Sequence, residues 1–329
     1  MSSSSPAPRG VRLHIVTGKG GTGKTTVAAS LAIALASAGR RVLLCEVEGR
    51  QGIASIFDVA PLPYDERRVA VGLDGGEVHA LAIDTEAALL EYLDMFYRLG
   101  RAGKALDRFG VIDFATTIAP GMRDVLLTGK VYEATNRRDA DGPTYDAVVL
   151  DAPPTGRIGR FLNVNTEVMG IAKVGPIRKQ ADAIMRLLKS PQTRVHLVTS
   201  LEEMPVQETL DGVDELHRIG LRVGALVVNL ALTAELSPAQ LKAARKGTLD
   251  AARIAVSLKE AGVKSDEAVV GGLLRVGREH AERIELETRQ RKQLGDAGLP
   301  VVELGLLADG VDLGGLYELA GQLRDSGEF

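Results

Sequence analysis

The chain has 329 residues, a net charge of −3 at pH 7 and a hydrophobic content of 45 %. This length suits one large α/β domain or two smaller ones, and the weak negative charge offers no electrostatic basis for a nucleic-acid partner. No run reaches the roughly 18 apolar residues that cross a bilayer, and the small polar residues at the start lack the apolar core of a signal peptide. We therefore expect a cytoplasmic protein that does not itself insert into a membrane.

Apolar runs rich in β-branched residues alternate with helical patterns along the chain. Near-continuous apolar runs, such as residues 147–150, are typical of strands buried on both faces of a parallel sheet. The alternation predicts a doubly wound α/β fold, a mostly parallel sheet flanked by helices. The predicted strands are residues 11–17, 41–47, 78–83, 145–151, 193–199, 222–229 and 300–304. The predicted helices are residues 26–38, 86–99, 123–137, 178–188, 206–218 and 313–323.

Two segments interrupt this alternation, at about residues 85–138 and 236–295. Both are mostly helical in pattern, and no linker rich in proline or glycine separates either from its surroundings. We interpret them as helical insertions in a single domain that covers residues 11–329. Residues 1–10 are predicted to form a disordered tail.

The first functional motif follows the first predicted strand. Residues 18–26 read GKGGTGKTT and fit the phosphate-binding pattern GxxxxGK[ST]. Glycines let successive N–H groups turn toward phosphate oxygens, at the start of a helix whose dipole favours anions. Lys24 suits the β- and γ-phosphates, the hydroxyl of Thr25 suits Mg²⁺, and Thr26 can reach the α-phosphate. The predicted residues for ATP are Gly18, Gly20, Gly21, Thr22, Gly23, Lys24, Thr25 and Thr26.

Acidic residues at two other strand ends suit the same chemistry. Asp151 closes an apolar strand, where an acid can order the Mg²⁺ shell, and Gly156 can supply an N–H near the γ-phosphate. A water nucleophile also needs a carboxylate, and Glu46 and Glu48 both approach the carboxyl edge of the sheet, where ligands of such folds bind. Spacing alone does not choose between these two. Glu48 is nearer the edge.

Asn229 ends the predicted strand 222–229. Its carboxamide presents donors and an acceptor that suit the edge of adenine. The same residue type also helps a strand turn into a loop, and both interpretations are open from the residues alone.

Together these residues resemble the family of arsenical-pump ATPases and tail-anchored-protein targeting ATPases. The specific match is DAPPTGRIGRFL at residues 151–162, which is similar to the switch II sequence DTAPTGHTLRFL of that family. The sequence APGMR at residues 119–123 resembles the helix start that precedes switch II. The P-loop sequence alone would also fit other families of P-loop proteins that carry an early lysine. The resemblance covers most of residues 11–325 and is to a single-domain, bacterial-type member.

The resemblance implies a dimer that closes on ATP and opens on hydrolysis. Lys19 would then reach the phosphates bound to the partner subunit and stabilise transition-state charge. The predicted catalytic residues are Lys19, Lys24 and Glu48. The resemblance also makes Asn229 an adenine reader. Because the chain has one P-loop, the dimer needs a second copy or a paralogous ATPase.

Departures from the family pattern shape the expected activity. The family usually has Asp-Pro where this chain has Glu48 and Gly49. The longer carboxylate could misplace the water, and a shift of about 1 Å can cost on the order of 100-fold in rate, so we expect hydrolysis to be slow or to depend on a partner subunit. Arg157 replaces a histidine of switch II. Cys45 is the only cysteine, which supports neither a CxxC zinc site nor activation by arsenite.

Three functions fit these observations. The first is a nucleotide-switched ATPase that acts on a protein partner or a membrane-protein client, with residues 87–99 and about 163–188 as a client groove. Packing in the core is the competing interpretation of those helices. The second is the motor of an anion or metalloid efflux pump with a separate membrane subunit. The third is a nucleotide-gated heterodimer scaffold with little turnover.

Overall fold

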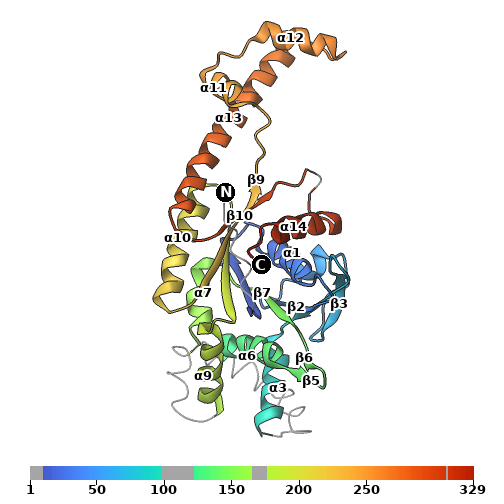
Figure 1. The fold of residues 1–329 in the computed structure, drawn as a ribbon, viewed down its shortest axis with the longest axis vertical. Helices are drawn as coiled ribbons and strands as arrows, with labels where there is room; N and C mark the ends of the chain where they lie inside the picture. The colour runs from blue at the N-terminus through green and yellow to red at the C-terminus, as the bar shows by residue number, and fades with distance from the viewer. Residues whose placement is uncertain (1–9, 98–121, 165–175, 309) are drawn as a thin grey trace.

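An eight-stranded sheet forms the centre of the molecule in the computed structural model, which describes residues 10–97, 122–164, 176–308 and 310–329 (Figure 1). The strand order is β10-β9-β8-β1-β7-β2-β4-β3, and all neighbours pair in parallel except β3 with β4. The strands are β1 (Leu13–Gly18), β2 (Arg41–Glu46), β3 (Arg67–Val71), β4 (Glu77–Ala82), β7 (Ala147–Asp151), β8 (Thr193–Thr199), β9 (Val223–Ala231) and β10 (Val301–Gly305). The predicted doubly wound, mostly parallel fold is confirmed.

Every strand predicted from the sequence is present, with ends that differ from the prediction by at most two residues. The antiparallel edge strand β3 was not predicted. It begins with two exposed arginines, Arg67 and Arg68, so it lacks the apolar run that marks the central strands. Charged residues on an edge strand discourage pairing with another chain. A small hairpin, β5 (Arg138–Asp139) with β6 (Gly142–Pro143), lies outside the main sheet.

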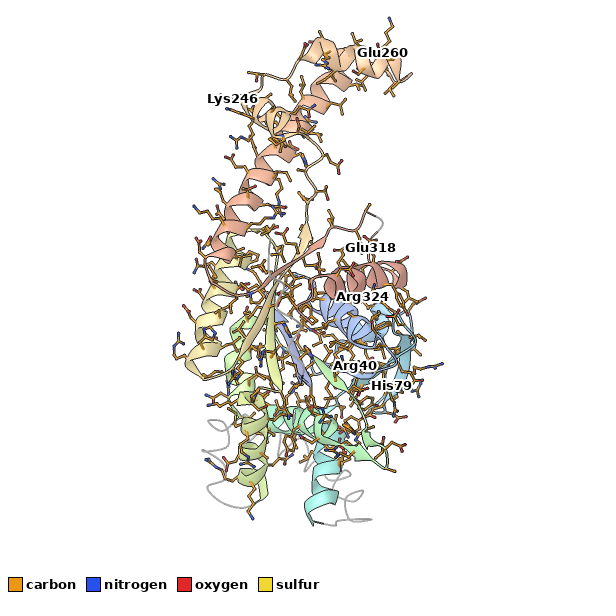
Figure 2. The ribbon with its side chains drawn as sticks, viewed as in Figure 1. Arg40, His79, Lys246, Glu260, Glu318 and Arg324 are labelled. Carbon is orange, nitrogen blue, oxygen red and sulfur yellow. The ribbon has the colours of Figure 1, made fainter. Side chains whose placement is uncertain are left out.

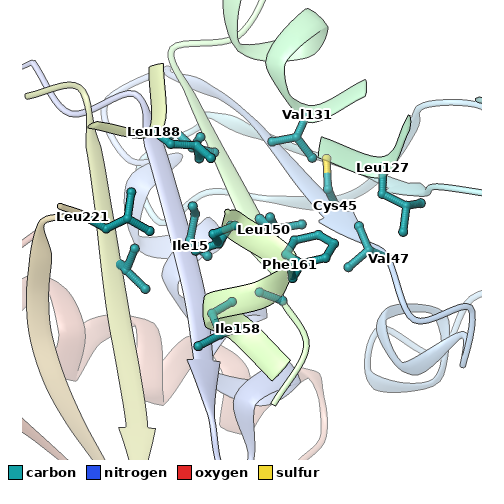
Figure 3. Packing of buried hydrophobic residues seen from close by; sticks show 14 of the residues in the cluster. Ile15, Cys45, Val47, Leu127, Val131, Leu150, Ile158, Phe161, Leu188 and Leu221 are labelled. Atoms are coloured by element: carbon teal, nitrogen blue, oxygen red, sulfur yellow. The ribbon is translucent and has the colours of Figure 1, made fainter. Parts of the chain in front are cut away.

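Helices cover both faces of the sheet because strand residues alternate between the faces. One core cluster joins the sheet to α1 (Lys24–Leu35), α2 (Gly52–Ile56) and α14 (Leu313–Asp325). The other joins it to α3 (Thr85–Tyr97), α6 (Met122–Asn136), α7 (Thr155–Leu162), α9 (Pro176–Lys189) and α10 (Glu203–Arg218). In the second cluster Ile158 and Phe161 of α7 pack near Ile15 and Leu150 (Figure 3). This packing holds α7 against the strands that carry the predicted site.

The predicted helical segment 236–295 forms an arm that projects from the end of β9 (Figure 1). It consists of α11 (Pro238–Lys246), α12 (Ala251–Glu260) and α13 (Glu267–Gly295). α11 packs against α13, whereas α12 has no buried residue. Lys246 and Glu260 lie in the arm, far from Glu318 and Arg324 on α14 (Figure 2).

A buried carboxylate fixes the base of this arm. The side chain of Glu287 in α13 is only 1 % exposed and lies 3.3 Å from both Arg283 and Arg291. It also accepts a hydrogen bond of 3.2 Å from the backbone N–H of Leu232, just after β9. Arginines one helical turn before and after Glu287 therefore offset the cost of burying its charge.

Several predictions fall on residues outside the described ranges. These include the predicted tail apart from Gly10, the segment 119–121 of the APGMR motif, and parts of the proposed client groove. Among the described residues, no helix combines the length and the apolar character needed to cross a membrane.

Candidate nucleotide site

The predicted P-loop connects β1 to α1 at the carboxyl edge of the sheet. Two of its glycines are required by close neighbours: a Cβ on Gly18 would lie 2.1 Å from the carbonyl oxygen of Val198, and one on Gly23 would lie 2.3 Å from Nδ2 of Asn229. Gly23 also has a φ of 84°, which favours glycine. No atom lies within 4 Å of a Cβ placed on Gly20 or Gly21. The loop is thus packed on one side and open on the side where phosphate would bind.

Side chains beneath the loop hold its shape. The hydroxyl of Thr22 lies 2.8 Å from the carbonyl oxygen of Lys19 and 3.2 Å from that of Val198. Buried Asn229 donates from Nδ2 to the carbonyl oxygen of Thr22 at 2.9 Å. Asn229 therefore supports the P-loop from β9, and its use as an adenine reader stays a prediction.

Thr25 and Asp151 meet at the predicted metal position. Parallel pairing of β1 with β7 places Asp151 opposite Val16, and Thr25 donates from Oγ1 to Oδ2 of Asp151 at 2.7 Å. The other carboxylate oxygen, Oδ1, is buried without a hydrogen-bond partner. Burial raises the pKa of Asp151 to about 6. A hydroxyl beside an unpartnered carboxylate oxygen is a donor set that fits Mg²⁺.

The two candidate carboxylates, Glu46 at the end of β2 and Glu48 two residues later, have different surroundings. Glu46 is buried and accepts a hydrogen bond of 3.1 Å from the N–H of Ile53 in α2. Glu48 is 18 % exposed and lies 3.6 Å from a guanidinium nitrogen of Arg157 and 4.0 Å from one of Arg50. Glu46 is thus engaged in holding α2, whereas Glu48 faces basic side chains near solvent.

A cavity of about 320 Å³ brings most of these groups together. It is lined by Gly21, Gly23, Lys24, Thr25, Glu46, Glu48, Arg50, Gly52 and Asp151. Of the predicted residues, Gly18, Lys19, Gly20, Thr22, Thr26, Gly156 and Asn229 are not part of its lining. Sequence reasoning missed Arg50 and Gly52, although both follow Glu48 in a turn. A Cβ on Gly52 would lie 3.4 Å from the methyl of Thr25, so a small residue lets α2 approach the P-loop.

The loop that carries Gly156 is tied to the P-loop strand. Thr17 of β1 donates from Oγ1 to the carbonyl oxygen of Pro153 at 2.7 Å, and α7 begins two residues later. Gly156 lies in the first turn of α7, and no atom lies within 4 Å of a Cβ placed there. Its N–H therefore sits at a helix N-terminus that is open near the backbone, as a phosphate contact would need.

Comparison with known proteins agrees with this geometry. The sequence model of the family described as "Anion-transporting ATPase" matches residues 11–192. "ATPase BagA" of Mycobacterium tuberculosis is 54% identical over 319 residues, which cover 97% of this chain and 94% of that protein. "Putative arsenical pump-driving ATPase 1" of Aquifex aeolicus is 29% identical over 226 residues, 63% of this chain and 52% of that protein. "ATPase GET3" of Eremothecium gossypii is 26% identical over 256 residues, 67% of this chain and 72% of that protein. The chain belongs to the anion-transporting ATPase family.

Proposed function

We propose that the protein is a Mg²⁺-dependent ATPase that works as a dimer and acts on a protein partner. The observation that carries the proposal is the contact between Thr25 and Asp151 beside the open P-loop. Family membership supports ATPase activity in general, and the dimer and the partner are the specific parts of the proposal.

Each group has a distinct task in this proposal. The P-loop N–H groups and Lys24 hold the phosphates, and Thr25 and Asp151 hold Mg²⁺, which would neutralise phosphate charge. Glu48 orients the attacking water. Since Glu48 lies beside Arg157, its carboxylate is drawn to a cation as well as to water, which favours slow turnover. Hydrolysis then acts as a timer for a conformational switch rather than as a rapid metabolic step.

The second subunit supplies Lys19 in this scheme. In the single chain Lys19 pairs with Glu208, and both side chains are partly exposed. An exposed ion pair is weak, so Lys19 can exchange Glu208 for the phosphates of a facing subunit at little cost. The partner subunit is a second copy or a paralogous ATPase.

The arm supports a protein partner. It carries the exposed apolar side chains Val256, Val263, Leu273 and Val276. Figure 1 shows α11 and α12 of the arm far from α1, the helix that follows the P-loop. A partner that covers the arm would bury these side chains, which contributes favourably to binding.

A pump motor is the second candidate, and the name of the family model favours it. Arsenite as the transported species is disfavoured, because Cys45 is buried and burial raises the pKa of its thiol. Other anions remain compatible with this candidate.

Light scattering in the presence and absence of Mg-ATP tests the dimer. We expect the mass to double with Mg-ATP in the wild type and to stay unchanged in Lys24→Ala, while Arg138→Gln, at an exposed position outside the nucleotide cavity, serves as the control that keeps the wild-type response. An unchanged wild-type mass would contradict the closed dimer. Nucleotide-dependent retention of single-helix apolar segments would support a client, whereas retention of only a multi-span membrane subunit would favour the pump motor.

A further inference from the structure

A second cavity, of about 550 Å³, lies at the amino-terminal edge of the sheet, at the opposite end of β1 from the P-loop. Its walls come from the starts of β1, β8 and β9, the end of α1 and the residues that follow α14. Its volume is in the range of sites for small organic ligands. None of its lining residues belongs to the nucleotide cavity.

Two buried histidines form a hydrogen-bonded pair in its wall. His14 and His196 are 4 % and 3 % exposed, their rings stack with centroids 5.3 Å apart, and Nδ1 of His14 lies 3.1 Å from Nε2 of His196. The N–H of Ala225 donates to Nδ1 of His196 at 3.1 Å. Because a backbone N–H can only donate, His196 must carry its proton on Nε2.

The tautomer of His196 determines that of His14. Nε2–H of His196 donates to Nδ1 of His14, so neutral His14 carries its own proton on Nε2. Burial lowers the pKa of both rings, that of His196 to about 3, which keeps the pair neutral near pH 7. Among the described residues Nε2–H of His14 has no hydrogen-bond acceptor, and His14 lines the cavity. The pair therefore presents one oriented N–H donor to the cavity.

The neighbouring strand is shaped to hold this pair. A Cβ on Gly224 would lie 2.5 and 2.6 Å from two atoms of the His196 ring. Only glycine leaves room for the ring against β9, since real Cβ atoms do not approach that closely. The ring of Phe329 also packs near that of His196, with the two centroids 5.0 Å apart. The imidazoles are thus fixed by backbone, by glycine and by an aromatic ring.

Two arginines contribute to the wall of the cavity. Arg40 and Arg194 line it, with Glu328 as the acidic residue of the lining, and among the described residues neither arginine is ion-paired. Arg194 donates from Nη1 to the carbonyl oxygens of Pro191 and Thr193, which fixes its position. Burial and nearby Arg222 lower the pKa of Arg194, as expected where cations lack a matching anion.

We propose that this cavity is a binding site for a small organic carboxylate. Arg40, Arg194 and Nε2–H of His14 would hold the carboxylate group, in the charge-assisted manner that arginine favours. Leu299 and Phe329 supply apolar walls for the rest of the molecule. An apolar wall beside two guanidinium groups favours an organic anion over inorganic phosphate, which has no apolar surface to bury.

Isothermal titration with benzoate, benzamide and inorganic phosphate tests the assignment. We expect benzoate to bind at millimolar concentrations or below, and its uncharged analogue benzamide and phosphate to bind at least about 10-fold more weakly. Arg40→Gln and Arg194→Gln should each weaken benzoate binding by about 10-fold or more, while Arg50→Gln leaves it unchanged. Failure to bind benzoate, equal binding of phosphate, or full affinity in both cavity variants would overturn the proposal.

Two further measurements separate this site from folding and from the proposed ATPase. Long-range ¹H–¹⁵N spectra of the wild type should show both histidines as Nε2–H tautomers and a shift of the His14 signals on addition of benzoate. A Nδ1–H tautomer of His14, or unmoved signals at saturation, would exclude the proposed contact. Lys24→Ala should bind benzoate with wild-type affinity, because the P-loop lies at the other end of β1; loss of benzoate binding in that variant would contradict a separate site.

Discussion

Lys19 of the P-loop binds Glu208 of α10, with Nζ 2.8 Å from Oε1. The side chains are 29% and 38% exposed, and an ion pair of that kind contributes at most about 1 kcal/mol, or roughly 5-fold in an equilibrium. We therefore expect Glu208→Gln to strengthen Mg-ATP-dependent dimerisation by up to about 5-fold, measured by sedimentation over a range of protein concentrations. Asp211→Asn, also on α10, is the control. Equal dimerisation of the two variants would show that Glu208 does not hold Lys19 back.

Removal of Lys19 itself should affect turnover and leave nucleotide binding intact. A cation that reaches the phosphates only across a dimer stabilises the transition state, so we expect Lys19→Ala to lower turnover by about 100-fold or more. Binding of a fluorescent ATP analogue to the same variant should stay near the wild-type level. Lys24→Ala, which should lose binding, is the comparison, and undiminished turnover in Lys19→Ala would remove the proposed role.

Binding of Mg-ATP should weaken in mild acid. Burial raises the pKa of Asp151 to about 6, against the opposing effects of Thr25 and Lys24. Protons therefore compete with Mg²⁺ below that pH, and the gain in ATP affinity on adding Mg²⁺ should fall by up to about 10-fold per pH unit below 6. Fluorescence titrations of ATP binding with and without Mg²⁺ between pH 5 and pH 8 measure this gain. Asp151→Asn should lose the pH dependence.

Protonation of Asp151 should stabilise the nucleotide-free protein, whereas it weakens binding of Mg-ATP. The folded carboxyl binds a proton more tightly than the unfolded one, whose pKa is about 4. Between about pH 6 and pH 4 the folded state therefore takes up more protons, and the contribution of Asp151 to the free energy of unfolding rises as the pH falls. Denaturant unfolding of the wild type and of Asp151→Asn over this range would show the difference.

Substitutions of Glu48 and of Glu46 should have different effects on turnover. We expect Glu48→Gln to lower turnover by about 100-fold or more and to leave ATP binding unchanged, because an amide cannot accept the proton of the attacking water. Glu46→Gln should have a much smaller effect on turnover, since its amide oxygen can still accept from the N–H of Ile53. Single-turnover assays under saturating ATP compare the two. A larger loss in Glu46→Gln would reassign the water-orienting role to Glu46.

Arg137 should matter for stability away from the nucleotide site. It donates to Glu66 at 2.8 and 2.9 Å and to Glu133 at 2.7 and 2.8 Å. Burial raises the pKa of Glu66, but hydrogen bonds from Arg137 and Tyr145 outweigh it and the net pKa is lowered. We expect Arg137→Met to lower the free energy of unfolding by about 2 kcal/mol near pH 7, because it leaves two partly buried carboxylates without their cation.

The pH dependence of that loss provides the check. A carboxyl with a lowered folded pKa stabilises the protein above its unfolded pKa, and this contribution is lost as the pH falls through the folded value. The difference between wild type and Arg137→Met should thus be full above about pH 5 and shrink in more acidic solution. Arg138→Met, at the exposed neighbouring position, should show little change. An equal loss at pH 3 and pH 7 would point to packing rather than charge.

The sequence predicts the sheet, the P-loop and the metal pair because those features rest on local patterns. Apolar runs mark the central strands, glycine spacing marks the P-loop, and Asp151 closes a buried strand. β3 escaped prediction because an exposed edge strand needs no such run. The pairing of Lys19 with Glu208 depends on where α10 packs, which no local pattern records. Alternation in the sequence places Glu46 and Glu48 on one strand face, but β2 ends at Glu46, and the positions of α2 and Arg157 give the two carboxylates different surroundings.

Two hydrogen bonds at the carboxyl end of β9 connect the P-loop to the base of the arm. Asn229 holds the carbonyl of Thr22 in the P-loop, and Leu232, just beyond β9, is held by Glu287 of α13. About 30 Å of continuous helix separates Glu287 from the start of α13 at Glu267. A rotation of about 5° at Glu287 therefore moves Glu267 by about 2.6 Å. A small displacement of the phosphate loop, if passed through β9 to Glu287, would therefore be amplified at the far end of α13.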